Sequence, residues 1–160
     1  MTKSILEAQP VGMLRVGLRL PIWLYRLGLG WLLDDRFLML THIGRHSGKP
    51  RQTVVEVVKH DPKSNDYYVV SGWGNKADWY RNIHKHPDVI IHAGWRTLHA
   101  HAEDIPFDEA VAILDEYTRL HPMAFKELTR IFLNEQLQPG PEVTRRLIAM
   151  MPMVVFRPHD

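Results

Sequence analysis

The chain has 160 residues, of which 45% are hydrophobic and 24% charged, a composition typical of one globular domain. Its formal net charge of only +2 gives no sign of a general polyanion binder, and the absence of cysteine excludes disulfides, thiolate metal sites and cysteine nucleophiles. Because the sequence shows neither a disulfide framework nor a signal peptide, we expect a cytoplasmic protein.

Residues 11–33 form the most apolar segment, but they contain three arginines and a central proline, namely Arg15, Arg19, Arg26 and Pro21. An arginine near a bilayer centre costs about 2.5–3.5 kcal/mol, which disfavours a membrane-spanning helix. Two short helices broken at Pro21 fit the sequence better. Three roles stay open for this segment: capping the protein core, covering a substrate pocket, or a peripheral contact with the inner face of the membrane.

Three strand-like runs follow this segment. Phe37–Ile43 is apolar on both faces, as in a strand buried on both sides, and Thr53–Lys59 is rich in β-branched residues. Tyr67–Trp73 is the third run, and polar turns at 44–50 and 61–66 separate the three. This order predicts a three-stranded antiparallel meander.

A short helix is expected from Asp78 to about His86, with Asp78 as the N-cap. By helical spacing, Trp79, Asn82 and Ile83 share one face of this helix. Further along, Val89–His92 and Thr97–Glu103 read as a hairpin, because residues of the second arm alternate between apolar and polar.

The last part of the chain is mainly helical in pattern. Phe107, at the position of a hydrophobic staple, and Asp108 open a helix that runs to about Leu120, where His121-Pro122 ends it. Two more helices and a closing strand are predicted at Ala124–Glu135, Glu142–Met150 and Met153–Arg157.

Six or so short antiparallel strands with a helix inserted among them favour a small barrel over a parallel α/β sheet. The predicted fold class is therefore mainly β, a barrel with N-terminal and C-terminal helices. With no internal repeat or linker, we predict a single domain over 1–160, made of a helical N-terminal segment 1–33, a barrel core 36–105, helices 107–150 and a closing strand 153–157.

The turn after the first strand, GRHSGKPRQT at 44–53, is the most informative segment. It contains cations and a hydroxyl but no acid, namely Arg45, Ser47, Lys49 and Arg51. Such a turn can direct backbone N–H groups and guanidinium groups at a phosphate, and the alternative is a solvated basic hairpin turn. A nucleotide P-loop is excluded, because the spacing of Gly44 and Gly48 is wrong and Pro50 replaces the required Ser or Thr.

A second candidate is SGWGNKADWYRN at 71–82, in which Trp73 and Trp79 flank a loop. Two indoles beside glycines can wall a flat aromatic ligand, with Lys76 and Asn82 adding charge and hydrogen bonds. Alternatively, Trp79 and Ile83 anchor the helix on the barrel and Asn82 is a surface amide.

Together these segments resemble the deazaflavin-dependent nitroreductase and quinone reductase family, a branch of the flavin-binding split β-barrel superfamily. The resemblance runs from about Phe37 to Pro122. It is carried by Gly44-Arg45-x-Ser47-Gly48-x-x-Arg51, by Trp79-Tyr80-x-Asn82 followed by Pro87, and by the hairpin segment Ala100–Glu103.

The resemblance implies a split β-barrel oxidoreductase that takes a hydride from reduced deazaflavin, coenzyme F(420), and gives it to a small nitro, quinone or enone acceptor. It also implies the cofactor contacts: the phosphate turn with Arg45, Ser47, Gly48, Lys49 and Arg51, the ring-side strand Thr53, Val54 and Val55, and the loop and helix with Trp73, Gly74, Asn75, Lys76, Trp79 and Asn82. Many relatives have a lysine where this chain has Gly72, with Lys76 the nearest cation.

No side chain is assigned as a catalytic nucleophile, because the cofactor supplies the chemistry. Candidates that could donate a hydrogen bond to the acceptor are Ser71, Tyr117 and His121, for each of which a structural role is the alternative. His84-x-His86 and His99-x-His101 lack a third ligand, so no metal is expected. Ser47 lacks the context of a nucleophile elbow.

FMN in the same fold is the alternative cofactor, and a non-catalytic flavin- or deazaflavin-binding protein is the alternative function. Because Arg45, Lys49, Arg51, Lys76 and Arg81 outnumber the acid Asp78 in these segments, we expect tighter binding of the longer, more negative deazaflavin coenzyme. Arg45 and Arg51 are expected to dominate that affinity. The predicted partners are a small-molecule acceptor, no nucleic acid, and a second copy of the chain in a homodimer.

Overall fold

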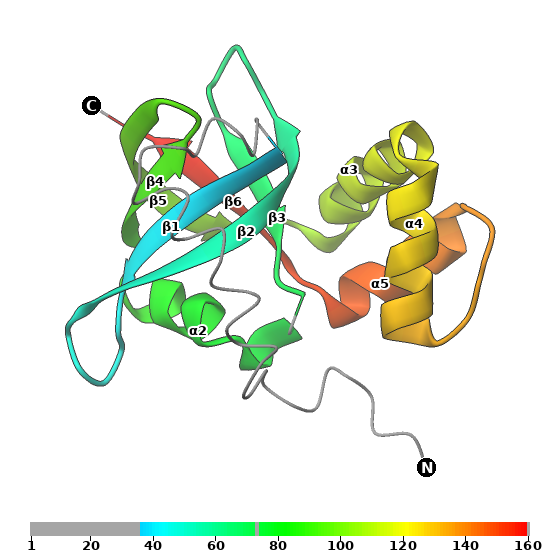
Figure 1. Cartoon of the computed structure of the whole chain (residues 1–160), viewed down its shortest axis with the longest axis horizontal. Coiled ribbons are helices and arrows are strands. Elements are labelled where there is room, and N and C mark those ends of the chain that lie inside the picture. Colours follow the sequence, from blue (N-terminus) through cyan, green and yellow to red (C-terminus); the bar gives the residue numbers. More distant parts are fainter. Residues whose placement is uncertain (1–35, 73, 160) are drawn as a thin grey trace.

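Six antiparallel strands close into a barrel in the order β1-β2-β3-β6-β5-β4 in the computed structural model, which describes residues 36–72 and 74–159 (Figure 1). The strands are β1 (Phe37–Ile43), β2 (Pro50–His60), β3 (Tyr67–Val70), β4 (Asp88–Ala93), β5 (Arg96–Asp104) and β6 (Met153–Pro158). The predicted barrel and its meander are confirmed. The predicted N-terminal helices at 1–33 lie outside the described residues.

The helices are inserted between strands or follow them. They are the short 3-10 helix η3 (Gly74–Lys76), α2 (Asp78–Lys85), α3 (Phe107–Leu120), α4 (Pro122–Leu128) and α5 (Pro141–Met150), with a π-helical turn, η4 (Thr129–Leu133), after α4. Figure 1 shows α2 below the barrel, whereas α3, α4 and α5 form a group beside it. None of the described helices is long and apolar enough to cross a membrane.

The barrel interior is filled by alternate residues of its strands. Leu38 and Leu40 of β1 are fully buried with Val55 and Val57 of β2, because residues two apart in a strand face the same side. Ile83 of α2 joins this core, and Trp79 and Tyr80 pack against it. Each large aliphatic side chain buried in this way stabilises the fold by about 1.5–3 kcal/mol, so α2 is firmly attached to one end of the barrel.

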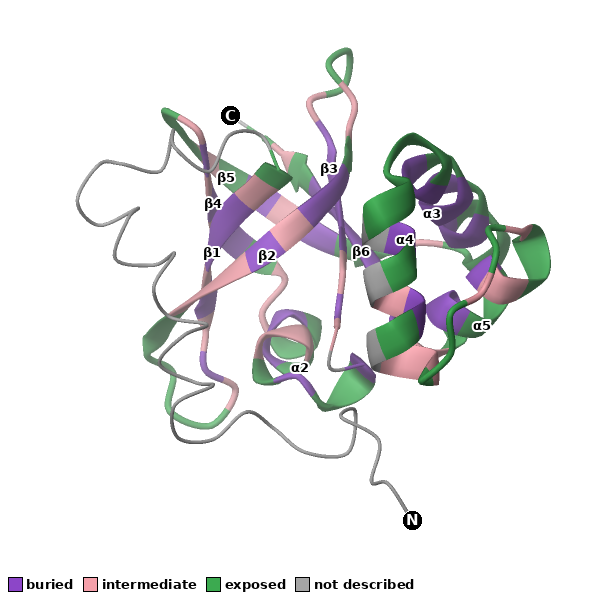
Figure 2. Cartoon of the chain, turned by 45° about the vertical axis from the view of Figure 1, so that its right-hand side comes forward, coloured by how far each residue is buried: buried purple, intermediate pink, exposed green. Residues whose placement is uncertain are grey.

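A second core joins the helices to the outside of the barrel. Val58 and Tyr68, on the outer face of β2 and β3, pack with Leu114 of α3, Phe125 of α4 and Leu147 of α5. Figure 2 shows the corresponding buried positions on α3 and α5, whereas the β1–β2 turn is exposed. The turn is therefore left open beside α2 while the opposite side of the barrel is covered.

Several predicted boundaries were wrong for local reasons. The strand predicted to Trp73 ends at Val70, because the fully buried Ser71 folds into a turn with its hydroxyl donating to the Gly74 carbonyl at 2.6 Å. The helix predicted at Ala124–Glu135 begins earlier, since Pro122 fits a first turn, and continues into η4.

The roles predicted for two residues at helix starts were also wrong, although α3 begins at Phe107 as predicted. Asp78 is the first residue of α2 rather than its N-cap, which is Ala77, and its carboxylate pairs with Arg45. Phe107 is likewise the first residue of α3 and is 42% exposed, so it does not form a staple. Arg145 of α5 lies over its ring, with the guanidinium carbon 5.0 Å from the centroid.

Candidate functional site

The β1–β2 turn is shaped by its two glycines. The Gly44 N–H donates to the Lys49 carbonyl and the Gly48 N–H to the Gly44 carbonyl, both at 2.9 Å. Gly48 has φ +66°, a left-handed conformation that favours glycine. Ser47 is held within the turn, because its Oγ accepts a hydrogen bond from the Lys49 N–H at 3.2 Å.

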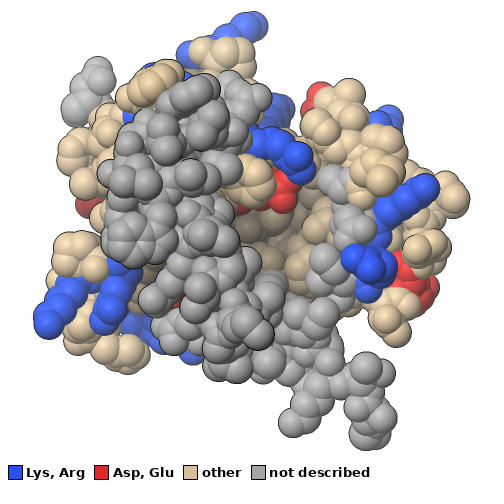
Figure 3. Space-filling view, viewed as in Figure 1, with Lys and Arg blue, Asp and Glu red and all other residues tan. Residues whose placement is uncertain are grey.

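The space above Gly44 is bordered by two groups suited to an anion. A Cβ added at Gly44 would lie 2.5 Å from Ser47 Oγ, 3.4 Å from the Lys49 carbonyl oxygen and 3.8 Å from Arg51 Nε. The Ser47 hydroxyl therefore occupies the place that a side chain at position 44 would take, with the Arg51 guanidinium near it. Arg51 and Lys49 are exposed, and neither is paired with an acid among the described residues. Figure 3 shows Lys and Arg atoms gathered at the lower left, where the turn lies.

Arg45 has different surroundings from Arg51. Its guanidinium donates to Asp78 Oδ1 at 3.2 Å and to Asn82 Oδ1 at 2.9 Å, and its side chain is only 21% exposed. The Arg45 backbone N–H also donates to Asn82 Oδ1, at 3.0 Å, and Lys85 Nζ donates to the Arg45 carbonyl at 2.8 Å. Arg45 thus fastens the turn to α2.

Asn82 is buried, so the alternative of a surface amide is excluded. Its Nδ2 lies 3.0 Å from Nδ1 of His42, a buried residue that sequence reasoning missed. Burial, opposed by the charge of Asp78 and reinforced by Arg51, lowers the pKa of His42 to about 4. The available signal was strand periodicity, which places His42 on the inward row of β1 with Leu38 and Leu40.

The predicted ring-side strand pairs on one side only among the described strands. Thr53–Glu56 of β2 pairs with β1, and the pairing with β3 begins only at Val57. Thr53, Val54 and Val55 lie within this stretch. Backbone groups at a sheet edge can pair with another chain or a ligand, and no described strand pairs with this edge.

The loop before α2 is held by close contacts with the end of α5 and with α2 itself. Gly74 has φ +64°, and a Cβ there would lie 2.9 Å from the Met150 carbonyl. Asn75 and Lys76 are exposed, and the Asn75 carbonyl accepts a hydrogen bond from Arg81 Nε at 3.0 Å. Trp79 packs on the barrel core, and Trp73 lies outside the described residues.

The three candidates for the acceptor side differ in access. Ser71 is buried and occupied with Gly74, whereas His121 is exposed and its ring lies 4.7 Å from that of Tyr117. The Tyr117 hydroxyl is mostly buried and donates to Glu56 of β2, which also accepts from Arg36 at 3.4 Å. Burial and the bond to Glu56 raise the pKa of Tyr117 to about 12.

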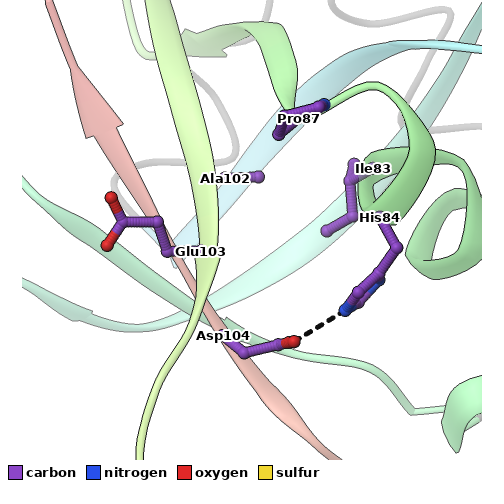
Figure 4. Close-up of a pocket in the computed structure, with 6 residues that line it drawn as sticks. All are labelled: Ile83, His84, Pro87, Ala102, Glu103 and Asp104. Atoms are coloured by element: carbon purple, nitrogen blue, oxygen red, sulfur yellow. Dashed lines mark hydrogen bonds and ion pairs between the residues drawn. The ribbon is translucent and has the colours of Figure 1, made fainter.

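Two small cavities lie near α2 and β5, and neither holds a tricyclic ring. One, of about 130 Å³, lies between Ile83, Pro87 and Ala102, with His84 and Asp104 beside it (Figure 4). The other, of about 150 Å³, lies between Tyr80 and Met153. Sites for drug-sized ligands measure about 300–1,000 Å³, so both cavities are too small for a ligand of that size.

His84 beside the first cavity contrasts with His42. Its Nδ1 lies 2.6 Å from the Tyr80 carbonyl and its Nε2 lies 2.7 Å from Asp104 Oδ2, so both ring nitrogens face acceptors. Burial works to lower the pKa of His84, but these two acceptors outweigh it and raise the pKa. The described residues contain no cluster of three or more potential metal ligands.

Comparisons with known proteins bear on the family and the fold of the chain. The family model of the F420H(2)-dependent quinone reductases matches residues 26–128. A structure of an F420-H2 dependent reductase is 17% identical, with a TM-score of 0.53 over 78% of this chain and 96% of that one. No curated protein matches the chain.

Two further structures share the fold. One, described as a domain-swapped dimer, is 16% identical with a TM-score of 0.53 over 86% of this chain and 99% of that one. The other, a pyridoxamine 5'-phosphate oxidase-related, FMN-binding protein from Nostoc punctiforme, is 12% identical with a TM-score of 0.52 over 92% and 81%. The split-barrel fold and the family predicted from the motifs are confirmed, and the chain belongs to the F420H(2)-dependent quinone reductase family.

Proposed function

We propose that this deazaflavin-dependent oxidoreductase reduces a small conjugated acceptor of the nitro, quinone or enone type, with the coenzyme held along the β1–β2 turn and the edge of β2 at Thr53–Val55. The observation that carries this proposal is the proximity of Ser47 Oγ and Arg51 Nε over Gly44, next to a stretch of β2 that pairs on one side only among the described strands. When bound, reduced F(420) supplies a hydride, and the acceptor also takes up one proton.

The phosphate of the coenzyme fits the open part of the turn. Ser47, Lys49 and Arg51 offer a hydroxyl, an ammonium and a guanidinium without an acidic partner among the described residues. Charge-assisted bonds from such groups contribute about 1.5–3 kcal/mol each. Arg45 and Asn82 were predicted as direct contacts, but their polar groups bond to one another, so we assign them to holding the turn.

The coenzyme ring fits beside Thr53–Val55. The unpaired edge of β2 offers backbone N–H and C=O groups there, and such groups orient a flat heterocycle without any special side chain. Asn75 and Lys76 are exposed just before α2, and we assign them to the border of the same site.

The acceptor fits the hollow that Figure 3 shows between the barrel and the helices α3 and α4. Glu56 follows the ring-side stretch directly and bonds to Tyr117, and His121 lies against the Tyr117 ring. His121 is exposed and is assigned as the hydrogen-bond donor to the acceptor oxygen. Tyr117, with its hydroxyl bonded to Glu56, is assigned to orienting this side of the pocket.

FMN is the second candidate cofactor, because a similar split barrel is an FMN-binding protein. A homodimer also stays a prediction, and one similar structure is a domain-swapped dimer. The predicted membrane contact falls on residues 11–33, outside the described part of the chain.

Anaerobic turnover tests the proposed function. Reduced F(420) and a small quinone are mixed with the protein, and the oxidised coenzyme is followed by its absorbance, with reduced FMN in a parallel reaction. We expect protein-dependent oxidation of reduced F(420). Tight binding of the coenzyme with no rate above the protein-free control, for quinone, nitro and enone acceptors alike, would favour the non-catalytic binding protein.

A further inference from the structure

We infer that His42 is a positioning residue for the anion-binding turn, acting through Asn82 on Arg45. His42 and Asn82 are both 4% exposed and form a polar pair at the end of the barrel core that α2 closes. A polar pair at such a place costs free energy unless its hydrogen bonds are made. This inference rests on the proposed function only in assigning a coenzyme to the turn.

The donors and acceptors fix the orientation of the pair. Arg45 presents only donors to Asn82, its backbone N–H at 3.0 Å and its guanidinium at 2.9 Å, so the amide oxygen must face Arg45. The amide nitrogen then faces His42 Nδ1 at 3.0 Å, and being a donor, it requires an unprotonated nitrogen there. His42 is therefore neutral, with its proton on Nε2.

The charges around the imidazole agree with a neutral ring. Asp78 of α2 favours the imidazolium, whereas burial and Arg51, which pairs with His42 across the β1–β2 ladder, disfavour it. With the acceptor at Nδ1 in place, the Asn82 oxygen is locked toward Arg45. Without it, the buried Nδ2 donor of Asn82 loses its acceptor. The free-energy cost of an unsatisfied buried donor then favours conformations in which Asn82 leaves this position, and the attachment of the turn to α2 weakens.

The consequence concerns the open side of the turn. Ser47 and Arg51 lie near each other over Gly44 only while the backbone at Arg45 keeps its place. His42 touches neither group, so its effect on an anion is indirect. A substitution at His42 should weaken coenzyme binding and leave the chemical step of the bound enzyme unchanged.

The test compares His42→Leu with His42→Asn, because Asn keeps an acceptor near the place of Nδ1 and Leu removes it. Amide hydrogen exchange is measured for Arg45, and for Ala102, whose N–H donates to the Pro87 carbonyl, as the control. We expect His42→Leu to speed exchange at Arg45 about tenfold and to raise the Kd for F(420) about tenfold, with kcat and Ala102 unchanged. His42→Asn should keep the exchange rate at Arg45 and the Kd for F(420) close to their wild-type values.

Two outcomes would overturn the inference: His42→Leu with wild-type exchange at Arg45, or His42→Asn as impaired as His42→Leu. If His42→Leu does not fold, the nitrogen spectrum of the wild-type imidazole decides. A neutral ring protonated at Nε2 at pH 7 supports the inference, and a ring protonated at Nδ1 contradicts it. Hydrogen exchange at Arg45 and the tautomer of His42 are both measured without coenzyme. They therefore test the inference even if the wild-type protein binds no F(420) and the proposed function fails.

Discussion

Arg45 and Arg51 belong to the same turn, yet their surroundings differ. Arg45 is largely covered and bonds to Asn82 and Asp78, whereas Arg51 is exposed and, among the described residues, meets no acid. Both residues match the family motif, so sequence alone gave them one role. The neighbours supplied by α2 separate the two: one cation holds the turn in place, and the other stays available to an anion.

The stability of the side of the turn that Arg45 and Asn82 hold should depend more on acid than that of the exposed side. The pKa of His42 is about 4 in the folded chain and about 6.5 when unfolded, so between these values the unfolded state binds more protons and stability falls as pH falls. The expected loss is about 2–3 kcal/mol from pH 7 to pH 4. Urea unfolding of the wild type and of His42→Leu at several pH values isolates this loss of stability. The carboxylates that both proteins share contribute equally to the pH dependence of each, so their contribution cancels in the difference. A stability difference independent of pH would show that His42 ionises normally.

Arg51→Ala should weaken coenzyme binding at the exposed side of the turn without affecting the attachment of the turn to α2. We expect coenzyme affinity to fall by about 1.5–3 kcal/mol, tenfold or more, with little change in the free energy of unfolding, because Arg51 is exposed. Fluorescence titration and urea unfolding give the two quantities, with the exposed Lys63→Ala outside the turn as a control for net charge. Unchanged affinity would remove Arg51 from the site.

Arg45→Ala should instead affect both quantities. Removing the guanidinium bond to the buried Asn82 oxygen should lower the free energy of unfolding by about 1 kcal/mol, and the ion pair with the exposed Asp78 adds little. Coenzyme binding should weaken as the turn loosens. Asp78→Asn is the matched control for the ion pair. Weaker binding without any loss of stability would mean that Arg45 contacts the coenzyme directly.

The smallest expected effect is that of Gly44→Ala. The new Cβ would displace the exposed Ser47 hydroxyl, a small side-chain movement, so affinity should fall only about threefold and stability by less than about 1 kcal/mol. Since the loss comes through Ser47, combining the change with Ser47→Ala should add nothing further. Additive losses in the double variant would show that Gly44 acts through the backbone instead.

The sequence predicted the fold better than the site. Strand β1 and helix α3 were predicted with their observed bounds or nearly so, because alternation and helical spacing are local signals. His42, Arg45 and Asn82 meet across sequence separations of about forty residues, which no local pattern encodes. The role of Asp78 was mistaken for the same reason, since its partner Arg45 comes from a distant turn.

In equilibrium titrations with F(420) and with FMN at one ionic strength, we expect F(420) to bind more tightly than FMN by at least about 1.4 kcal/mol, or tenfold, because the cations around the turn and α2 outnumber the one acid, Asp78. FMN binding at about micromolar Kd or tighter, with no detectable binding of F(420), would contradict the proposal that this turn holds a deazaflavin coenzyme.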